Sequence, residues 1–189
     1  MLIPLLAAAA LFLAGCKESP APAGGGKQAA EPVSLEKIAA EAKGFNAGSP
    51  MSARVYYVFF DAQCPHCAQL WLAAKPLKSQ ARFVWIPVAL LKGNSTSQGA
   101  ALLASPDGSA AMDGHEKSMA ERGGGIIATG DTEQQKAAVA KNTELFNQYG
   151  FASVPTVVGK HAQTGNLVVQ EGAMPTGPLA QALGLSAAQ

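Results

Sequence analysis

Two cysteines separated by two residues, in the motif Cys64-Pro65-His66-Cys67, constrain this chain more than any other feature of its sequence. The motif closely follows a strand-like run, Arg54–Phe60, and opens a segment that is predicted to be helical to about Lys78. A Cys-x-x-Cys pair at a strand-to-helix junction is typical of a thiol–disulfide redox site. Cys64 would then lie at a helix N-terminus, where free N–H groups and the helix dipole favour a thiolate.

The length of the chain fits one domain, and its charge gives no sign of a nucleic-acid partner. Its 189 residues are enough to bury a core, and 14 basic side chains nearly balance 13 acidic ones. This balance gives no reason to expect nucleic-acid binding. Apart from Cys16, the chain has no cysteine that could compete with Cys64 and Cys67 for a disulfide.

The N-terminus is predicted to be a targeting segment over residues 1–15. The run Leu2–Ala14 is apolar but shorter than the about 20 residues that a membrane-spanning helix needs. Leu13-Ala14-Gly15-Cys16 resembles the lipobox of bacterial lipoproteins, which implies a lipid-modified Cys16; an ordinary signal peptide that contains a cysteine is the alternative. Residues 16–33 would form the lipidated cysteine and a flexible tether, and residues 34–189 the folded domain. We therefore expect a periplasmic protein held to a membrane by its lipid.

Turn residues and apolar spacing predict a first short helix and then the order β, α, β, a helical insertion, α, β, β, α. The predicted strands are Arg54–Phe60, Arg82–Val88, Pro155–Gly159 and Asn166–Gln170. The predicted helices are Leu35–Lys43 (capped by Ser34 and ended by Gly44), Pro65–Lys78 (kinked at Pro76), Thr96–Ala104, Ser109–Glu121, Asp131–Tyr149 (capped by Asp131 and ended by Gly150) and Gly177–Leu183. Trp71, Trp85, Phe59 and Phe60 are expected in the core, and Phe151 either there or beside the site.

This order resembles a thioredoxin-like α/β fold, in which helices flank a mixed central sheet, with a helical insertion. The resemblance rests on the cysteine motif after a strand and on Val154-Pro155-Thr156 about ninety residues later. In thioredoxin-like proteins the proline of the second piece is cis and faces the active disulfide. The resemblance implies this role for Pro155, and a substrate groove that Val154, Thr156 and Pro65 border.

From Val55 to about Leu183 the chain is similar to the catalytic domains of the DsbG and DsbC proteins. The likeness is carried by Val55–Asp61, by Ala100–Ser105 in the insertion and by Asn142–Phe146 before the proline loop. Those proteins also have an N-terminal dimerisation domain, for which this sequence has no counterpart, so we expect a monomer. The Cys-Pro-His-Cys motif, with valine before the proline, instead resembles DsbA, the disulfide donor.

These resemblances imply a thiol:disulfide interchange enzyme whose only redox group is the Cys64–Cys67 pair, without a further cofactor. We favour oxidation of envelope proteins that contain cysteines, with re-oxidation by a DsbB-like membrane partner. A DsbG- or DsbC-like isomerase or a reductase, kept reduced by a DsbD-like partner, is the alternative.

Each candidate residue then has an expected role. Cys64 exchanges disulfides with substrate, Cys67 resolves the mixed disulfide, and His66 stabilises the Cys64 thiolate. Asp61 could be a proton relay or a substrate-loop contact near the cysteines. The favoured interpretation is a turn or cap residue at the end of its strand.

Two other functions are less well supported. A metallochaperone could bind zinc or copper(I) through Cys64 and Cys67 with a histidine. His66 lies inside the pair, however, and His115 and His161 are expected to be solvated, so we predict no metal site. A purely structural disulfide within one helical turn would constrain almost no chain. The run Gly123–Gly125 is expected to be a flexible loop.

Overall fold

A computed structural model describes residues 30–91 and 93–187. The predicted signal segment, Cys16 and most of the predicted tether lie outside these residues. The helices are α1 (Leu35–Glu41), α2 (Pro65–Ala74), the 3-10 turn η1 (Lys75–Leu77), α3 (Ser95–Ala104), α4 (Gly108–Ala120), α5 (Glu133–Gln148) and α6 (Thr176–Leu183). The strands are β1 (Phe45–Gly48), β2 (Val55–Phe60), β3 (Arg82–Pro87), β4 (Thr156–Lys160) and β5 (Leu167–Glu171).

The strands form one mixed sheet in the order β1-β3-β2-β4-β5. Strands β2 and β3 are parallel, with Val55 opposite Arg82, whereas β4 runs antiparallel to β2, with Phe59 opposite Thr156. The ends of β2 and β3 and the start of β4 therefore lie at the same edge of the sheet. We call this edge the redox edge, because β2 leads from it into the cysteine motif.

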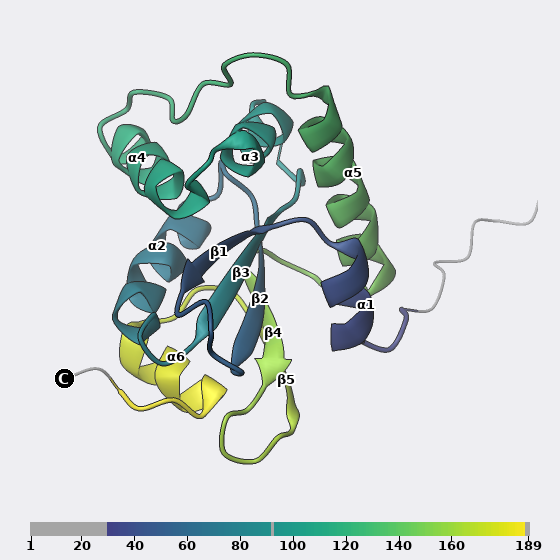
Figure 1. The fold of residues 1–189 in the computed structure, drawn as a ribbon, viewed down its shortest axis with the longest axis vertical. Helices are drawn as coiled ribbons and strands as arrows, with labels where there is room; N and C mark the ends of the chain where they lie inside the picture. The colour runs from purple at the N-terminus through teal and green to yellow at the C-terminus, as the bar shows by residue number, and fades with distance from the viewer. Residues whose placement is uncertain (1–29, 92, 188–189) are drawn as a thin grey trace, which may run out of the picture.

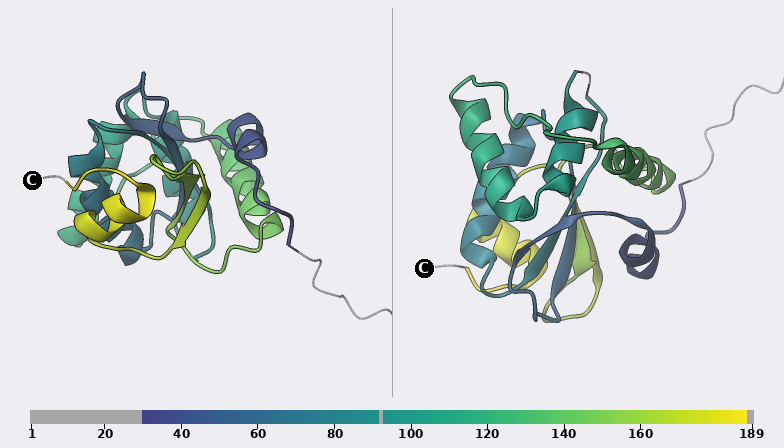
Figure 2. Two further views of the ribbon diagram at one scale, coloured as in Figure 1. Left: turned by 90° about the horizontal axis from the view of Figure 1, so that it is seen from below. Right: turned by 45° about the horizontal axis from the view of Figure 1, so that its top comes forward.

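The helices cover both faces of this sheet (Figure 1). Helices α2 and α6 pack on one face and α1 and α5 on the other, while α3 and α4 lie beyond the redox edge. The two views in Figure 2 also show α2 and α6 on one side of the sheet and α1 and α5 on the other. The insertion between β3 and α5 thus places two helices over the edge at which the cysteines lie.

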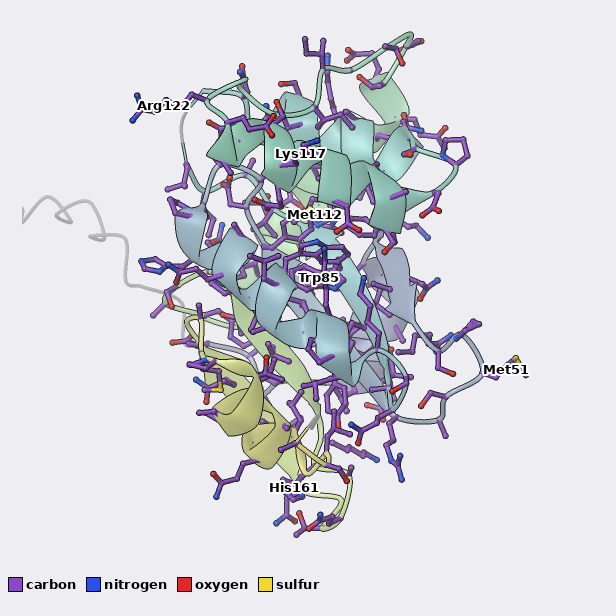
Figure 3. All side chains as sticks on the ribbon, turned by 90° about the vertical axis from the view of Figure 1, so that its left-hand side faces the viewer. Met51, Trp85, Met112, Lys117, Arg122 and His161 are labelled. Atoms are coloured by element: carbon purple, nitrogen blue, oxygen red, sulfur yellow. The ribbon has the colours of Figure 1, made fainter. Side chains whose placement is uncertain are left out.

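Two apolar clusters fill the space between sheet and helices. Under α2 and α6, Trp71 and Trp85 meet edge to face with ring centroids 4.9 Å apart. Under α1 and α5, Phe59 packs against Phe146 and Phe151, which shows that Phe151 belongs to this core. Figure 3 shows Trp85 and Met112 inside the molecule, whereas Met51 and Arg122 point away from it. The predicted core positions of Trp71, Trp85, Phe59 and Phe60 are confirmed.

The sequence missed one strand and misplaced some helix ends. Strand β1 is too short and too rich in Gly and Ala to stand out, and it forms by pairing antiparallel with β3. Helix α1 is capped by Ser34 as expected, but it ends at Glu41 with Ala42 extended, so Gly44 does not terminate it. Helix α2 ends at Ala74 and is followed by η1, which contains Pro76, instead of continuing to Lys78.

The ends of α5 match the prediction only in part. Thr132 occupies the N-cap position that was predicted for Asp131, although the Asp131 carboxylate accepts a hydrogen bond from the Glu133 N–H. At the other end, Gly150 has a φ of +67° and follows the C-cap, as predicted. Within residues 30–91 and 93–187 we find no helix that is both long and apolar enough to cross a membrane.

Candidate active site

The redox edge brings the two sequence motifs together. Cys64 follows β2 and occupies the N-cap position of α2. Its sulfur lies 3.7 Å from the Val154 carbonyl oxygen, to which the thiol can donate. The Val154–Pro155 peptide bond is cis, which confirms the expectation from the motif. Residues 90 positions apart in sequence thus meet because β4 runs antiparallel beside β2.

Cys64 is partly exposed and is held in an environment that favours its thiolate. A hydrogen bond from the Cys67 thiol is the largest influence, and it lowers the pKa of Cys64 to about 6 against the opposing effect of burial. The backbone N–H groups of Cys67 and His66 and the charge of the His66 side chain act in the same direction. The position at the helix N-terminus, read from the sequence, therefore carries the expected electrostatic consequence.

Cys67 differs from Cys64 in almost every respect. It is fully buried on the inner face of α2, and burial raises the pKa of its thiol, with the neighbouring Cys64 thiolate adding to the effect. An incoming sulfur can therefore reach Cys64 but not Cys67.

His66 and Pro65 are both exposed on the first turn of α2. The His66 Nδ1 atom lies 3.1 Å from the Gln69 Oε1 atom, so the side chain is directed along the helix surface. Its influence on Cys64 is exerted through its charge and through its backbone N–H. Pro65 occupies the first helical position, where a missing N–H costs nothing.

The residues around the cis-proline differ in exposure. Val154 is partly exposed and Pro155 is buried. Thr156, which the sequence assigned to the substrate groove, is fully buried, and its hydroxyl donates to the Ser153 carbonyl oxygen at 2.5 Å. The Thr156 side chain therefore supports the proline loop and does not reach a substrate, because the first residue of β4 points into the core.

Asp61 organises the turn between β2 and the cysteines. Its buried carboxylate accepts hydrogen bonds from the Gln63 N–H at 2.9 Å and from the Ser95 hydroxyl at 2.7 Å. It also accepts from the backbone N–H groups of Leu90 and Leu91, which follow β3. Both carboxylate oxygens are therefore engaged by hydrogen-bond donors of the turn and its neighbours, which favours the turn role over a proton relay.

The insertion contributes two residues that the sequence analysis missed, both from α4. His115, expected to be solvated, is only 1% exposed, and its Nε2 atom lies 2.8 Å from the Ala62 carbonyl oxygen. The spacing from Met112 to His115 places both on the buried face of α4, which is the signal that could have revealed it. The next residue, Glu116, is half-buried; burial and the nearby Cys64 thiolate raise its pKa to about 7.

The metal-binding interpretation gains no support from the histidines. His161, also expected to be solvated, is partly buried in a turn, where its Nδ1 accepts from the Gln163 and Thr164 N–H groups at 3.4 and 3.3 Å. Among the residues that the structure describes, no three His, Cys, Asp or Glu side chains gather as metal ligands would.

Comparison with known proteins agrees with this geometry. The thiol:disulfide interchange protein DsbG of Pseudomonas aeruginosa is 32% identical over 145 residues, which cover 72% of this chain and 54% of DsbG. The catalytic domain of Proteus mirabilis ScsC superposes with a TM-score of 0.62 at 16% identity, over 79% of this chain and 92% of that domain. A periplasmic thioredoxin-like protein from Salmonella enterica serovar Typhimurium superposes with a TM-score of 0.61 at 16% identity, over 82% of this chain and 97% of its own.

The chain is a thioredoxin-fold relative of the Dsb thiol:disulfide interchange proteins. The mixed sheet, its flanking helices and the helical insertion were predicted correctly. No protein-family model matches the chain. The chain spans about half the length of the DsbG that it matches, and the identities to the solved structures establish the shared fold alone.

Proposed function

We propose that the protein is a thiol:disulfide oxidoreductase that exchanges disulfides with envelope proteins through Cys64 and Cys67. The observation that carries this proposal is the contrast within the pair. Cys64 is accessible, with a pKa lowered to about 6, whereas Cys67 is buried with a raised pKa. One sulfur is suited to exchange with a partner and the other to remain inside as the resolving thiol.

The exchange proceeds in two steps when the protein begins as the disulfide. A substrate thiolate attacks the Cys64 sulfur, which forms a mixed disulfide and releases Cys67 as a thiolate that takes up a proton. The second substrate thiolate then attacks the substrate sulfur of the mixed disulfide and releases Cys64 as a thiolate. Two electrons pass from the substrate dithiol to the pair, and the substrate leaves with a new disulfide.

Substrate orientation is assigned to the proline loop. The Val154 carbonyl lies beside the Cys64 sulfur, and the exposed Pro65 flanks it on the other element. An extended substrate segment would pair with the Val154 backbone while its cysteine reaches Cys64. Pro155 is buried beneath this loop and presents no N–H to the sulfurs.

Oxidation of substrates is the favoured direction, because a stabilised Cys64 thiolate stabilises the reduced pair and makes its disulfide oxidising. The sequence match to DsbG keeps an isomerase or reductase as the second candidate. We propose the bacterial periplasm as the location, supported by the lipobox-like sequence before Cys16, with a lipid anchor, a monomeric state and a DsbB-like membrane partner; a DsbD-like partner belongs to the second candidate.

The test is a quenched exchange assay between the oxidised protein and a peptide with two thiols. The wild-type disulfide should oxidise the peptide, and Cys64→Ser should lose all exchange. Reduced Cys67→Ser should accumulate a mixed disulfide when it is given the same peptide in its disulfide form, because Cys64 attacks the peptide disulfide and no Cys67 thiol remains to resolve the product. Retention of exchange by Cys64→Ser would refute the mechanism. Equilibration with glutathione decides the direction: a strongly oxidising potential supports the donor, and a reducing potential supports the isomerase or reductase.

A further inference from the structure

The helical insertion reaches the cysteine motif through a buried histidine that the exchange mechanism does not use. The His115 Nε2 atom lies 2.8 Å from the carbonyl oxygen of Ala62, two residues before Cys64. Ala62 itself is buried. Helix α4 therefore holds a peptide group immediately upstream of the exchanging cysteine.

The hydrogen bond at the other ring nitrogen of His115 determines which nitrogen carries the proton. Its Nδ1 atom accepts a hydrogen bond from the Ile126 N–H at 3.0 Å, so it carries no proton, and Nε2 must be the donor to Ala62. Burial lowers the pKa of His115, which keeps the ring neutral. The imidazole thus bridges the turn 123–126, after α4, and the backbone before Cys64.

Gln98 of α3 forms a second bridge between the same two segments. Its Oε1 atom accepts from the side-chain amide of Gln63, and its Nε2 atom donates to the Gly124 carbonyl oxygen at 2.6 Å. The turn packs against both bridging side chains: a Cβ on Gly125 would lie 2.6 Å from His115 Cε1 and 2.7 Å from Gln98 Nε2.

We propose that His115, with Gln98 beside it, is a positioning residue of the redox site, which couples the turn 123–126 to the backbone that places Cys64. This inference rests on the redox function proposed above. The Cys64 sulfur lies between the N–H groups of His66 and Cys67, which favour the thiolate, and the Val154 carbonyl oxygen, which favours the thiol. A small displacement of the segment 62–64 changes this balance and therefore changes the pKa of Cys64 and the reduction potential of the pair.

Three substitutions of His115 separate its two hydrogen bonds. The side-chain amide of His115→Gln can replace the Nε2 donor to Ala62, whereas the amide oxygen of His115→Asn can replace the Nδ1 acceptor for Ile126. His115→Leu removes both. We expect His115→Leu and His115→Asn to raise the Cys64 pKa by about half a unit or more and to make the potential more reducing, and His115→Gln to preserve both values.

A glycine substitution perturbs the same histidine without changing its chemistry. Gly125 and Gly124 have φ values of +86° and +84°, so alanine is strained at either position. A Cβ on Gly124 meets no atom within 4 Å, whereas one on Gly125 meets His115 and Gln98. Both alanine variants share the backbone strain, but only Gly125→Ala adds a clash with His115 and Gln98, so Gly125→Ala should shift the Cys64 pKa in the direction of His115→Leu and should do so further than Gly124→Ala.

The measurements are the absorbance of the Cys64 thiolate as a function of pH and the equilibrium with glutathione, alongside the melting temperature. Tyr56→Phe is the stability control, since it loses a buried hydrogen bond to the Leu183 carbonyl at the opposite end of the sheet. If the His115 variants and Gly125→Ala only lower the melting temperature, as Tyr56→Phe does, the positioning role is refuted. A wild type without exchange activity would instead refute the proposed function, and this inference with it.

Discussion

The two ends of the β2 strand are built in different ways. At the redox edge, buried polar side chains gather around the turn that leads to Cys64; they include Asp61, Ser95, Gln98 and His115. At the opposite end, Tyr56 packs on Phe83 with ring centroids 5.6 Å apart, among buried leucines of α6. The polar group of Tyr56 is paired there with the Leu183 carbonyl at 2.8 Å.

The difference separates stability from chemistry. Apolar burial stabilises a fold without fixing any one atom closely, whereas a buried polar group is tolerated only when its hydrogen bonds hold their partners in place. The redox edge uses such bonds to fix the backbone around Cys64. We therefore expect changes at the opposite end to alter stability alone and changes at the redox edge to alter the thiols.

Leu183→Ala tests the apolar end. Leu183 is fully buried, and its truncation should lower the free energy of unfolding by about 2–5 kcal/mol through lost burial and a new cavity. Chemical denaturation measures the loss. The Cys64 pKa should equal that of the wild type at temperatures where the variant is folded; a shifted pKa would erase the distinction between the two ends.

Asp61→Asn tests the polar end. The amide nitrogen of the variant would face backbone N–H groups whose hydrogen bonds the carboxylate now accepts. Each N–H group left unpaired lowers the free energy of unfolding by about 1–3 kcal/mol. We expect lower stability together with a shifted Cys64 pKa, measured by denaturation and by thiolate absorbance. If stability stays at the wild-type level while the exchange rate falls, Asp61 acts as a proton relay and not as the organiser of the turn.

Glu116→Gln tests the charge beside Cys64 at the redox edge through its pH dependence. The pKa of Glu116 is raised to about 7, so this group favours folding below its unfolded pKa, and its contribution is lost as the pH rises through 7. Above pH 7 the substitution should raise stability and make the reduction potential more oxidising, because a negative charge beside the Cys64 thiolate is removed.

Below pH 6, where Glu116 is already protonated in the wild type, the Glu116→Gln potential should match that of the wild type. Potentials measured against glutathione at pH 5.5 and pH 8 check this expectation. If the variant and the wild type have the same potential at pH 8 as well as at pH 5.5, Glu116 does not act on the pair.

His66→Ala should have the smallest effect of these changes. The charge of His66 is the last of the influences on Cys64, its side chain is exposed, and water screens it. The backbone N–H at this position remains in the variant. We expect a slight rise in the Cys64 pKa, seen by thiolate absorbance; a rise to the ordinary cysteine value would show that the imidazole stabilises the thiolate, and not the Cys67 thiol and the backbone N–H groups.

The parts of the site that follow from local chemistry could be predicted from the sequence. Cys64, Cys67 and Pro155 belong to motifs in which a short stretch of sequence determines the backbone around it. The core face of α5, with Val139, Leu145 and Phe146, follows from helical spacing in the same way.

The parts that depend on tertiary contacts could not be predicted. Strand β1 exists because β3 offers a free edge, and His115 is buried because α4 folds back over the turn that holds Ala62. No residue near His115 in the sequence indicates its hydrogen-bond partner, the Ala62 carbonyl, which lies 53 residues away. For Thr156 the prediction was wrong in the other direction. The motif predicted a substrate contact, but the register of β4 directs the side chain into the core.

The redox edge makes Cys64 an accessible thiolate while Cys67 stays protonated. Thiolate absorbance of the reduced protein, titrated from pH 3 to pH 10 beside Cys64→Ser, tests it most directly. We expect one thiol ionisation near pH 6 that disappears in Cys64→Ser, and no second thiol ionisation in this range. A Cys64 that ionises near the ordinary value of about 8.5, or an ionisation near pH 6 that persists in Cys64→Ser, would contradict it.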